Sequence, residues 1–487
     1  MDHEKIFARE EEIQTLDTLL NSKEAEFLAI YGRRRVGKTY MIREYFSKKN
    51  CVYFEITGQK DGNMKEQLEN FIQIFSKTFF DEAPLKTPTK WKKAFELLTK
   101  QIDQIPLSQH IILFFDELPW LATSKSKMLQ ALDYYWNRFW SQREKLLLIV
   151  CGSAASWMLD NLINAKGGLH NRLTKTIHLR PYSLKDTRQF LAKRGIHLQP
   201  KQVLDLYMVF GGIPHYLKQV EKGKSALQIV NKTCFQKEGL LYDEFDRLFK
   251  SLFTQSADCL LLIKTIAQHR YGISRDDLIK ESKIPSGGTL KKRLQELESA
   301  GFIQSYIPYG HKIKDHYYRV IDEYCYFYLH WIEPFKRKGV EGGKEYWQVK
   351  GKTASAISSS GYSFEILCFK HIDQIRKALD LQGISSEAGS WRFNSVKGKK
   401  EMGAQIDLLF DRDDGVITAC EIKYSEKIFV LEKSEAKNII NKIEVFEKQT
   451  KTKKQILVAL ITTIDLKPNI WSEELIHNVI TLEDLFQ

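Results

Sequence analysis

The sequence lacks any apolar run that approaches the roughly 20 residues needed to cross a bilayer. Its first five residues, Met1 to Lys5, are mostly charged, whereas a secretory signal needs an apolar stretch there. These two absences argue against a membrane protein and against a secreted one. We therefore expect a cytoplasmic protein with no membrane partner.

Cysteine is scarce and scattered. The chain has 7 cysteines, and no two of them form a CxxC pair of the kind that holds zinc in small metal-binding modules. The count is odd and several lie in apolar runs, as Cys151 does, so a disulfide framework is not expected. We expect reduced thiols in the core.

Internal repeats and low-complexity tracts are also missing. At 487 residues the chain is too long for one hydrophobic core, and about three domains are expected. Lys and Arg number 74 against 61 Asp and Glu, an excess of 13. Such an excess is compatible with a polyanionic partner such as DNA. A basic protein without that partner is the alternative.

Short apolar runs alternate with amphipathic helices up to about residue 180. Such runs are typical of parallel strands whose two faces are covered by helices. The strands predicted in this way are residues 26–31, 51–56, 110–115 and 146–151.

A phosphate-binding motif follows the first of these strands. Residues 32–39 read GRRRVGKT, which fits GxxxxGK[ST] between a strand and a helix over 38–46. Glycine-rich backbone can wrap so that successive N–H groups point at phosphate oxygens, and the helix N-terminus adds partial positive charge. The residues expected to hold ATP are Gly32, Arg33, Arg34, Arg35, Val36, Gly37, Lys38 and Thr39. Among them, Lys38 is expected to reach the β- and γ-phosphates and Thr39 to bind Mg²⁺.

Acidic residues end the strand over 110–115. Asp116 is expected to hold Mg²⁺ through water, and Glu117 to polarise the attacking water as the catalytic residue. A carboxylate at the tip of a buried strand is costly unless it serves a cation. Ser153, at the tip of the strand over 146–151, is positioned to touch the γ-phosphate or that water; a turn residue is the alternative.

Together these residues resemble the AAA+ superfamily, and within it the archaeal and bacterial ATPase family related to the STAND nucleotide switches. Residues 6–13 look like that family's N-terminal FxGRExEL-type box, although Ala8 stands where glycine is usual. Residues 167–173 match the segment after sensor 1, and residues 211–214, GGIP, resemble the GxP motif of the helical lid. The resemblance covers about residues 6–220 and implies that Pro214 packs near the adenine.

Arg172, in the segment after sensor 1, has two interpretations. It acts as an arginine finger on a neighbouring subunit, which implies a homo-oligomer, or it makes a salt bridge within its own subunit. The three arginines of the P-loop are expected to be solvated, because the motif does not require positive charge there.

The middle of the chain is predicted to be helical over 181–253 and to continue as three short helices over 257–300. Ser274 is the expected N-cap of the second of these, and the third carries Lys291, Lys292 and Arg293 away from its apolar face. Residues 301–303 and 317–320 are expected to form a wing. This spacing looks like a winged helix-turn-helix, whose recognition helix can enter a DNA major groove; a fold that only stabilises the lid or mediates protein contacts is the alternative.

Two strands near the C-terminus carry acidic residues. Residues 406–410 and 416–422 read as an antiparallel pair, which brings Asp407 and Glu421 together at one end of a sheet. Lys423 lies two residues past Glu421 and so points to the same face. Two carboxylates and a strand carbonyl make a hard-oxygen site for Mg²⁺, and the lysine can orient a water.

This arrangement resembles the PD-(D/E)xK nuclease core, in the DUF234-like version fused to these ATPases. By that resemblance Asp407 and Glu421 are metal ligands, Lys423 is catalytic, and Glu365 is the upstream helical acid that completes the metal site. Ile406 stands where the motif has proline. A copy that binds DNA without cleaving it, and ordinary charges at strand ends, are the alternatives.

The predicted fold class is α/β multidomain. Its predicted parts are a P-loop AAA+ core (1–180), a helical lid (181–253), a winged helix-turn-helix (254–320), an aromatic-rich connector (321–353) and a restriction-endonuclease-like α/β domain (354–487). The expected function is an ATP- and Mg²⁺-dependent ATPase coupled to a DNA-acting winged helix and a nuclease domain. The competing hypotheses are an ATP-controlled STAND-like switch with an inert nuclease-like domain, and a scaffold whose partner is another protein.

Overall fold

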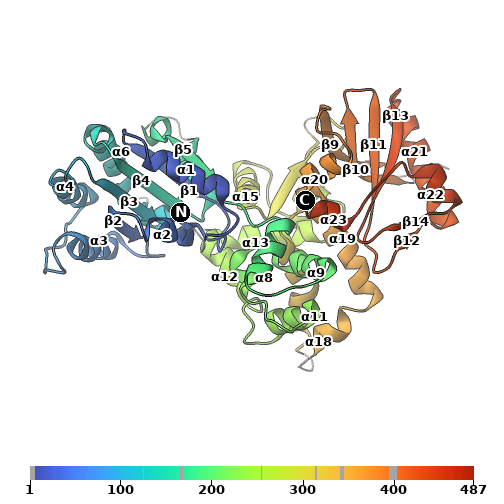
Figure 1. Cartoon of the computed structure of the whole chain (residues 1–487), viewed down its shortest axis with the longest axis horizontal. Coiled ribbons are helices and arrows are strands. Elements are labelled where there is room, and N and C mark those ends of the chain that lie inside the picture. The colour runs from blue at the N-terminus through green and yellow to red at the C-terminus, as the bar shows by residue number, and fades with distance from the viewer. Residues whose placement is uncertain are drawn as a thin grey trace. The chain divides into compact units, whose positions relative to one another are not determined.

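The computed structural model describes residues 6–123, 125–164, 168–253, 255–312, 315–339, 345–393 and 403–487. The charged start, Met1 to Lys5, lies outside this part. The chain divides into two compact units, and each is described by itself. One unit is Met1–Pro181 with Arg247–Ser256, and the other is Tyr182–Asp246 with Ala257–Gln487. Figure 1 labels many of the helices and strands of both.

The first unit contains a five-stranded sheet with the order β2-β3-β4-β1-β5. Its strands are β1 (Glu26–Tyr31), β2 (Cys51–Thr57), β3 (His110–Asp116), β4 (Leu146–Gly152) and β5 (Lys175–His178). Every neighbouring pair is parallel, which confirms the predicted parallel sheet and its four apolar strands. β5 was not predicted, because only Ile177 is buried on this short edge strand and the hydrophobic pattern is correspondingly weak.

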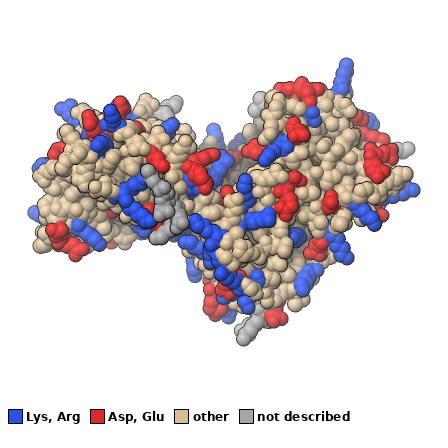
Figure 2. Space-filling model, in the orientation of Figure 1, with Lys and Arg blue, Asp and Glu red and all other residues tan. Residues whose placement is uncertain are grey.

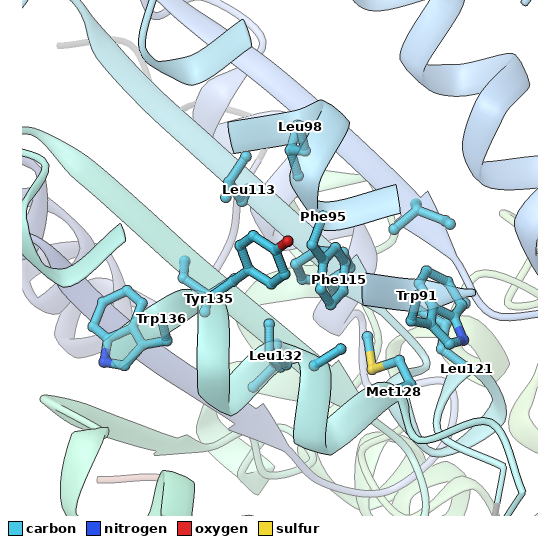
Figure 3. Close-up of a cluster of buried hydrophobic side chains, with 14 of the residues drawn as sticks. Trp91, Phe95, Leu98, Leu113, Phe115, Leu121, Met128, Leu132, Tyr135 and Trp136 are labelled. Atoms are coloured by element: carbon cyan, nitrogen blue, oxygen red, sulfur yellow. The ribbon is translucent and has the colours of Figure 1, made fainter. Parts of the chain in front are cut away.

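Amphipathic helices pack against this sheet. They include α1 (Glu10–Leu20), α2 (Lys38–Phe46), α3 (Met64–Phe79), α4 (Trp91–Ile102) and α6 (Met128–Arg138). Figure 3 shows how Trp91 and Phe95 of α4 lie with Phe115 of β3 and Tyr135 of α6 in one aromatic-rich core. Burial of such large rings contributes most of the favourable free energy in a core of this kind. The core thus fixes the strand ends that carry the polar residues.

The second unit begins with helices. They are α8 (Leu184–Lys193), α9 (Pro200–Phe210), α10 (Pro214–Leu217) and α11 (Ala226–Val230), followed by α12 (Glu244–Leu252), in which the boundary between the units falls. This confirms the helical character predicted for residues 181–253.

Three helices and a small sheet follow: α13 (Ser256–Ala267), α14 (Arg275–Ser282) and α15 (Gly288–Ser299), with β6 (Ile273–Ser274), β7 (Ile303–Tyr306) and β8 (Tyr317–Val320). The strands are antiparallel in the order β6-β8-β7. The hydroxyl of Ser274 accepts a hydrogen bond from the backbone N–H of Asp277 at 3.1 Å, which confirms the predicted N-cap. The two-residue strand β6 was not predicted, since it is too short to leave a periodic pattern.

The prediction that Arg293 lies away from the apolar face of α15 is wrong. Arg293 is buried, at 9% exposure, and its guanidinium forms ion pairs with Glu296 and, at 3.9 Å, with Asp258. Lys291 and Lys292 are exposed as expected. Position 293 lies between the two faces of the helix, and the acidic neighbours provide the partners that burial of a cation requires.

The C-terminal part is a second α/β arrangement. Its five-stranded sheet has the order β15-β13-β11-β10-β9, with bounds β9 (Ser386–Phe393), β10 (Ala404–Arg412), β11 (Val416–Lys423), β13 (Gln455–Thr462) and β15 (Asn478–Ile480). Strands β10 and β11 form the predicted antiparallel pair, with Leu408 opposite Cys420. The helices α19 (Ala354–Lys370) and α21 (Lys433–Thr450) accompany this sheet. Helix α19, which carries Glu365 as predicted, begins after Thr353, whose side chain caps it.

Figure 2 shows Lys and Arg interspersed with Asp and Glu on the visible face. Among the described residues, no helix combines the length and the apolar character that a membrane span needs. No cysteine of the described chain is in a disulfide, and all but Cys51 are buried, which confirms the predicted reduced core thiols.

Candidate functional site

The P-loop connects β1 to α2 and depends on two glycines with positive φ. Gly32 has φ 148° and Gly37 has φ 98°. A Cβ atom on Gly32 would lie 2.3 Å from the carbonyl oxygen of Leu179, so a side chain is excluded there. Gly37 is the N-cap of α2 and turns the chain into the helix. The loop therefore has the wrapped backbone that a phosphate nest requires.

Lys38 is the cation at the centre of this loop. Its Nζ atom donates hydrogen bonds to the carbonyls of Gly32 at 2.9 Å and of Arg33 at 3.1 Å, and the residue is buried. Both partners are neutral, so the ammonium group has a charge for an anion to neutralise. The position fits the predicted role towards the phosphates of ATP.

Thr39 and Asp116 are brought together as predicted. The Thr39 hydroxyl donates to Oδ2 of Asp116 at 2.9 Å. The other oxygen, Oδ1, is buried and accepts no hydrogen bond from a nitrogen or oxygen donor in the described chain. Burial and, secondly, the neighbouring charge of Glu117 raise the pKa of Asp116. A buried carboxylate with an unsatisfied oxygen, next to a hydroxyl, fits a Mg²⁺ site. The ion would be held by an oxygen of Asp116 and by the hydroxyl oxygen of Thr39.

Glu117 follows Asp116 in a left-handed conformation, with φ 47°. For a residue with a Cβ atom this conformation costs about 1–2 kcal/mol. Its carboxylate accepts hydrogen bonds from the backbone N–H of Ser153 at 3.1 Å and from the Ser153 hydroxyl at 2.8 Å. Hydrogen bonds between Glu117 and Ser153 thus join the tips of β3 and β4. Ser153 contacts the carboxylate that is predicted to polarise the attacking water.

The prediction that all three P-loop arginines are solvated is wrong for Arg33. This residue is 6% exposed, whereas Arg34 and Arg35 are half-buried. Val36 is also buried. The motif pattern constrains glycine, lysine and threonine only, so it gave no signal for the burial of an intervening side chain.

Arg9 is a residue of this site whose role was not predicted, although its sequence box was noticed. Its guanidinium donates to the carbonyl of Arg180 at 2.8 Å and reaches that of Val36 at 3.5 Å. It therefore connects the N-terminal box to the P-loop and to the segment after β5. The motif over residues 6–13 was the only sequence signal for Arg9. Its partners, the carbonyls of Val36 and Arg180, lie far from it in the sequence and could not be predicted.

The structure also places Arg172 and Pro214, two further residues for which the sequence suggested a role at the ATP site. Arg172 ends the short helix η3 (Gly168–Arg172) and is exposed. Among the described residues it has no ion-pair partner, and both interpretations of Arg172 stay predictions. Pro214 begins α10 in the second unit, and its packing near an adenine stays a prediction.

A second constellation lies on the C-terminal sheet. Asp407 of β10 accepts hydrogen bonds from the backbone N–H of Ile422 at 3.3 Å and from the Gln405 side chain at 3.1 Å. Burial, and after it the charges of Glu421 and Glu365, raise the pKa of Asp407 to about 7. The three predicted acids thus lie within electrostatic reach of one another, from β10, β11 and α19.

Glu421 is held by two lysines. Its Oε1 atom lies 3.1 Å from Nζ of Lys423, and its Oε2 atom accepts a hydrogen bond from Lys442 at 2.7 Å. Burial alone lowers the pKa of Lys423, but the charge of Glu421 outweighs this and raises it. Lys442, from α21, was missed by sequence reasoning, because nothing in a helix of mixed charge distinguishes one lysine.

Glu365 is paired with a residue of the preceding segment. Arg270 donates to its Oε1 atom at 2.8 Å. Burial raises the pKa of Glu365, and Arg270 acts against this. In the described chain no group of three or more His, Cys, Asp and Glu side chains is arranged to hold a metal ion. The three acids lie near one another, but two of them, Glu365 and Glu421, already form ion pairs with cations.

Comparison with known proteins gives one family match. Residues 6–220 match a family described as an ATPase domain predominantly from Archaea. An uncharacterized protein of Methanocaldococcus jannaschii is 24% identical over 426 residues, which are 86% of this chain and 87% of the relative. An uncharacterized ATP-binding protein of the same organism is 42% identical over 41 residues, 8% of this chain and 70% of the relative.

Solved structures give weaker similarities. The Walker-type ATPase PABY2304 of Pyrococcus abyssi is 18% identical, with a TM-score of 0.47 over 67% of this chain and 97% of that one. The ORC2 protein of Aeropyrum pernix, in ADPNP and ADP complexes, is 14% identical, with a TM-score of 0.43 over 69% and 95%.

Proposed function

We propose that this chain, whose residues 6–220 are an ATPase domain of the family described as predominantly from Archaea, hydrolyses ATP with Mg²⁺ and acts on DNA through its second unit. The ATP-binding ATPase follows from the family. The use of Mg²⁺, the DNA-binding role and the cleavage of DNA are the parts that we add.

The ATPase part rests on the pairing of Thr39 with Asp116 and of Glu117 with Ser153. When bound there, Mg²⁺ neutralises charge that develops on the phosphates. Thr39 and Asp116 would hold it, and Lys38 would contact the β- and γ-phosphates. Glu117 would orient the attacking water, with Ser153 fixing its carboxylate.

The Lys38→Ala substitution is expected to weaken ATP binding by at least about tenfold, since a charge-assisted hydrogen bond to phosphate is worth roughly 1.5–3 kcal/mol. Isothermal titration calorimetry with a non-hydrolysable analogue would measure this. The exposed Lys92, changed to Ala, is the matched control and should bind as wild type. Equal affinity of a folded Lys38→Ala protein would contradict the assignment of the P-loop.

The DNA-binding part rests on α13, α14 and α15 with their antiparallel sheet. Three short helices followed by two strands are the order of a winged helix, in which the third helix enters the major groove. Its exposed basic residues are Lys291 and Lys292, and the buried Arg293 belongs to the internal packing of the domain.

Removal of both exposed charges, by Lys291→Ala with Lys292→Ala, is expected to weaken DNA binding and to reduce its salt dependence. Each lost phosphate contact lowers the slope of log affinity against log salt by about 0.9 for duplex DNA. Fluorescence anisotropy over a salt series measures the slope. Lys92→Ala with Lys93→Ala, on α4, removes the same charge elsewhere. If both double variants keep the wild-type slope, α15 does not contact DNA.

The nuclease part rests on one observation, the meeting of Asp407, Glu421 and Lys423 at one end of β10 and β11. A bound Mg²⁺ or Mn²⁺ would supply Lewis-acid stabilisation of the phosphate. Asp407 and Glu421 would hold it, and Lys423, freed from Glu421, would orient a water towards the phosphorus atom.

The decisive experiment incubates the full chain with single- and double-stranded DNA, with and without ATP, in Mg²⁺ or Mn²⁺. Cleavage that requires the metal is the expected result. A chain that hydrolyses ATP and binds DNA, but cleaves no DNA in either metal, would contradict the nuclease part alone.

The competing function is a non-cleaving switch, in which ATP controls a DNA- or protein-binding module. The ion pairs of Glu365 with Arg270 and of Glu421 with Lys442 favour it, because a metal must displace both cations. The same incubation decides between the two functions.

A further inference from the structure

A cavity of about 990 Å³, including the part open to solvent, lies in the second unit beside the acids of the C-terminal sheet. One wall comes from residues 270–271, 306–311 and 317–319, and the other comes from α19, β9 and β10. Glu365 and Asp407 are both in its lining. Whatever occupies the cavity therefore lies next to the proposed reaction centre.

Hydrogen bonds hold the first of these walls in place. The N–H of Tyr309, in the turn between β7 and β8, donates to the carbonyl of Ser390 on β9 at 2.9 Å. The Tyr306 hydroxyl donates to the carbonyl of Tyr271 at 2.7 Å. Gly272 allows this approach, because a Cβ atom there would lie 2.5 Å from the same hydroxyl. The shape of the cavity is therefore held by specific hydrogen bonds within the second unit.

Aromatic rings and guanidinium groups alternate on its surface. Arg319 lies over Phe369, at 3.5 Å from the ring centroid, and over Tyr306 at 4.8 Å. Arg392 lies over Tyr271 at 5.1 Å. The Tyr271 ring itself is 40% exposed. These flat, partly exposed groups offer stacking surfaces of the kind that hold a nucleobase.

The charge of the cavity favours an anion. Arg270 is neutralised by Glu365, but neither Arg319 nor Arg392 has a carboxylate within ion-pair distance in the described chain; Arg319 bonds to the neutral amide oxygen of Gln304 at 2.8 Å. Burial removes the Arg319 guanidinium from water and lowers its pKa. A phosphate group would compensate this charge.

We infer that the cavity binds an unpaired nucleotide of a DNA strand, with its base against Tyr271 or Tyr306 and its phosphate near Arg319 and Arg392. A base stacked within a duplex presents only its edges and cannot enter such a cavity unless it is unpaired first. The inference rests on the proposed action on DNA, and it specifies the substrate: a single strand, or a duplex with an unpaired end.

The test uses the full chain, with Ca²⁺ in place of Mg²⁺, and three oligonucleotides of one sequence: a single strand, a blunt duplex and a duplex with an unpaired tail. A fluorescent aminopurine in the unpaired segment reports stacking, and anisotropy reports affinity. We expect the single strand and the tailed duplex to bind more tightly than the blunt duplex, with quenching of the aminopurine.

Two variants test the cavity. Tyr271→Ala and Arg392→Ala are expected to lower affinity for the single strand by about 5- to 100-fold, the range of one base–aromatic contact, and to abolish quenching. Tyr271→Phe keeps the ring and should bind as wild type. Tyr134→Ala removes a tyrosine of similar exposure, 45%, from the first unit and is the control.

Wild-type affinity of both Tyr271→Ala and Arg392→Ala for the single strand would overturn the inference, as would tighter binding of the blunt duplex. Cleavage assays separate this from the proposed function. A chain that cleaves DNA while these variants bind normally retains the nuclease and loses the cavity. A chain that binds and quenches through Tyr271 but cleaves nothing retains the cavity and loses the nuclease.

Discussion

The Glu117→Gln substitution is expected to lower ATP turnover by about 100- to 10,000-fold, the range for loss of a general base. The amide keeps the shape of the side chain and can still bond to Ser153, but it cannot take a proton from water. ATP binding is expected to remain, because Lys38, Thr39 and the loop backbone are untouched. Phosphate release measures turnover, and calorimetry measures binding.

Two variants serve as controls for this result. Glu11→Gln, on an exposed position of α1, removes the same charge and should hydrolyse ATP as wild type. Ser153→Ala leaves the carboxylate in place but removes its hydroxyl partner, so we expect a smaller loss than for Glu117→Gln. Wild-type turnover by Glu117→Gln would show that another group activates the water.

The second large effect concerns the C-terminal acids. Asp407→Asn is expected to lower metal-dependent DNA cleavage by at least about 100-fold, because a metal ion contributes several kcal/mol to such a reaction. ATP hydrolysis should be unchanged, since the two sites belong to different units and share no residue, and independent sites act nearly additively. Asp413→Asn, at an exposed turn position, is the matched control. Wild-type cleavage by Asp407→Asn would remove this residue from the site.

The same variant has an expected effect on stability without metal. The pKa of Asp407 is raised to about 7 in the folded protein, above its value of about 3.9 in an unfolded chain. The unfolded state therefore holds fewer protons between these values, and stability falls as pH rises through that window. Asp407→Asn lacks this loss, so its advantage in Tm should grow from about pH 4 to about pH 7 and then level off. An advantage that is independent of pH would contradict the raised pKa.

The ATP site was predicted from the sequence because its determinants are local. The P-loop must have glycine where φ is positive, and the two acids must end an apolar strand, so the pattern itself carries the geometry. Ser153 was expected to touch the γ-phosphate or the attacking water. Its pairing with Glu117 was not predicted, although it lies where the tips of neighbouring parallel strands meet. The burial of Arg33 did not follow, because it depends on surroundings that no short motif records.

For the C-terminal site, the sequence predicted the pair of strands and the positions of the acids and of Lys423, but not the other cations that contact the acids. An antiparallel pair of strands was enough to bring Asp407 and Glu421 together, and a period of two placed Lys423 on the same face. The cations that now hold the acids come from elsewhere: Arg270 lies 95 positions before Glu365, and Lys442 lies on a helix. Arg293 misled for a similar reason, since its partner Asp258 belongs to another helix. Contacts of this kind are set by tertiary packing, which residue patterns do not encode.

The boundary within α12 bears on how the protein can be divided. The segment Arg247–Ser256 belongs to the first unit, although it follows residues of the second unit in the chain. Within the first unit, the backbone carbonyl of Lys250 accepts a hydrogen bond from the side chain of Lys60 at 3.0 Å. No single cut in the polypeptide separates the two units. A fragment that ends at residue 181 loses part of its own fold, and one that ends at 256 carries helices whose packing partners are missing. Expression of either unit by itself therefore requires a new linker: residue 181 joined to residue 247 for the first unit, and residue 246 joined to residue 257 for the second.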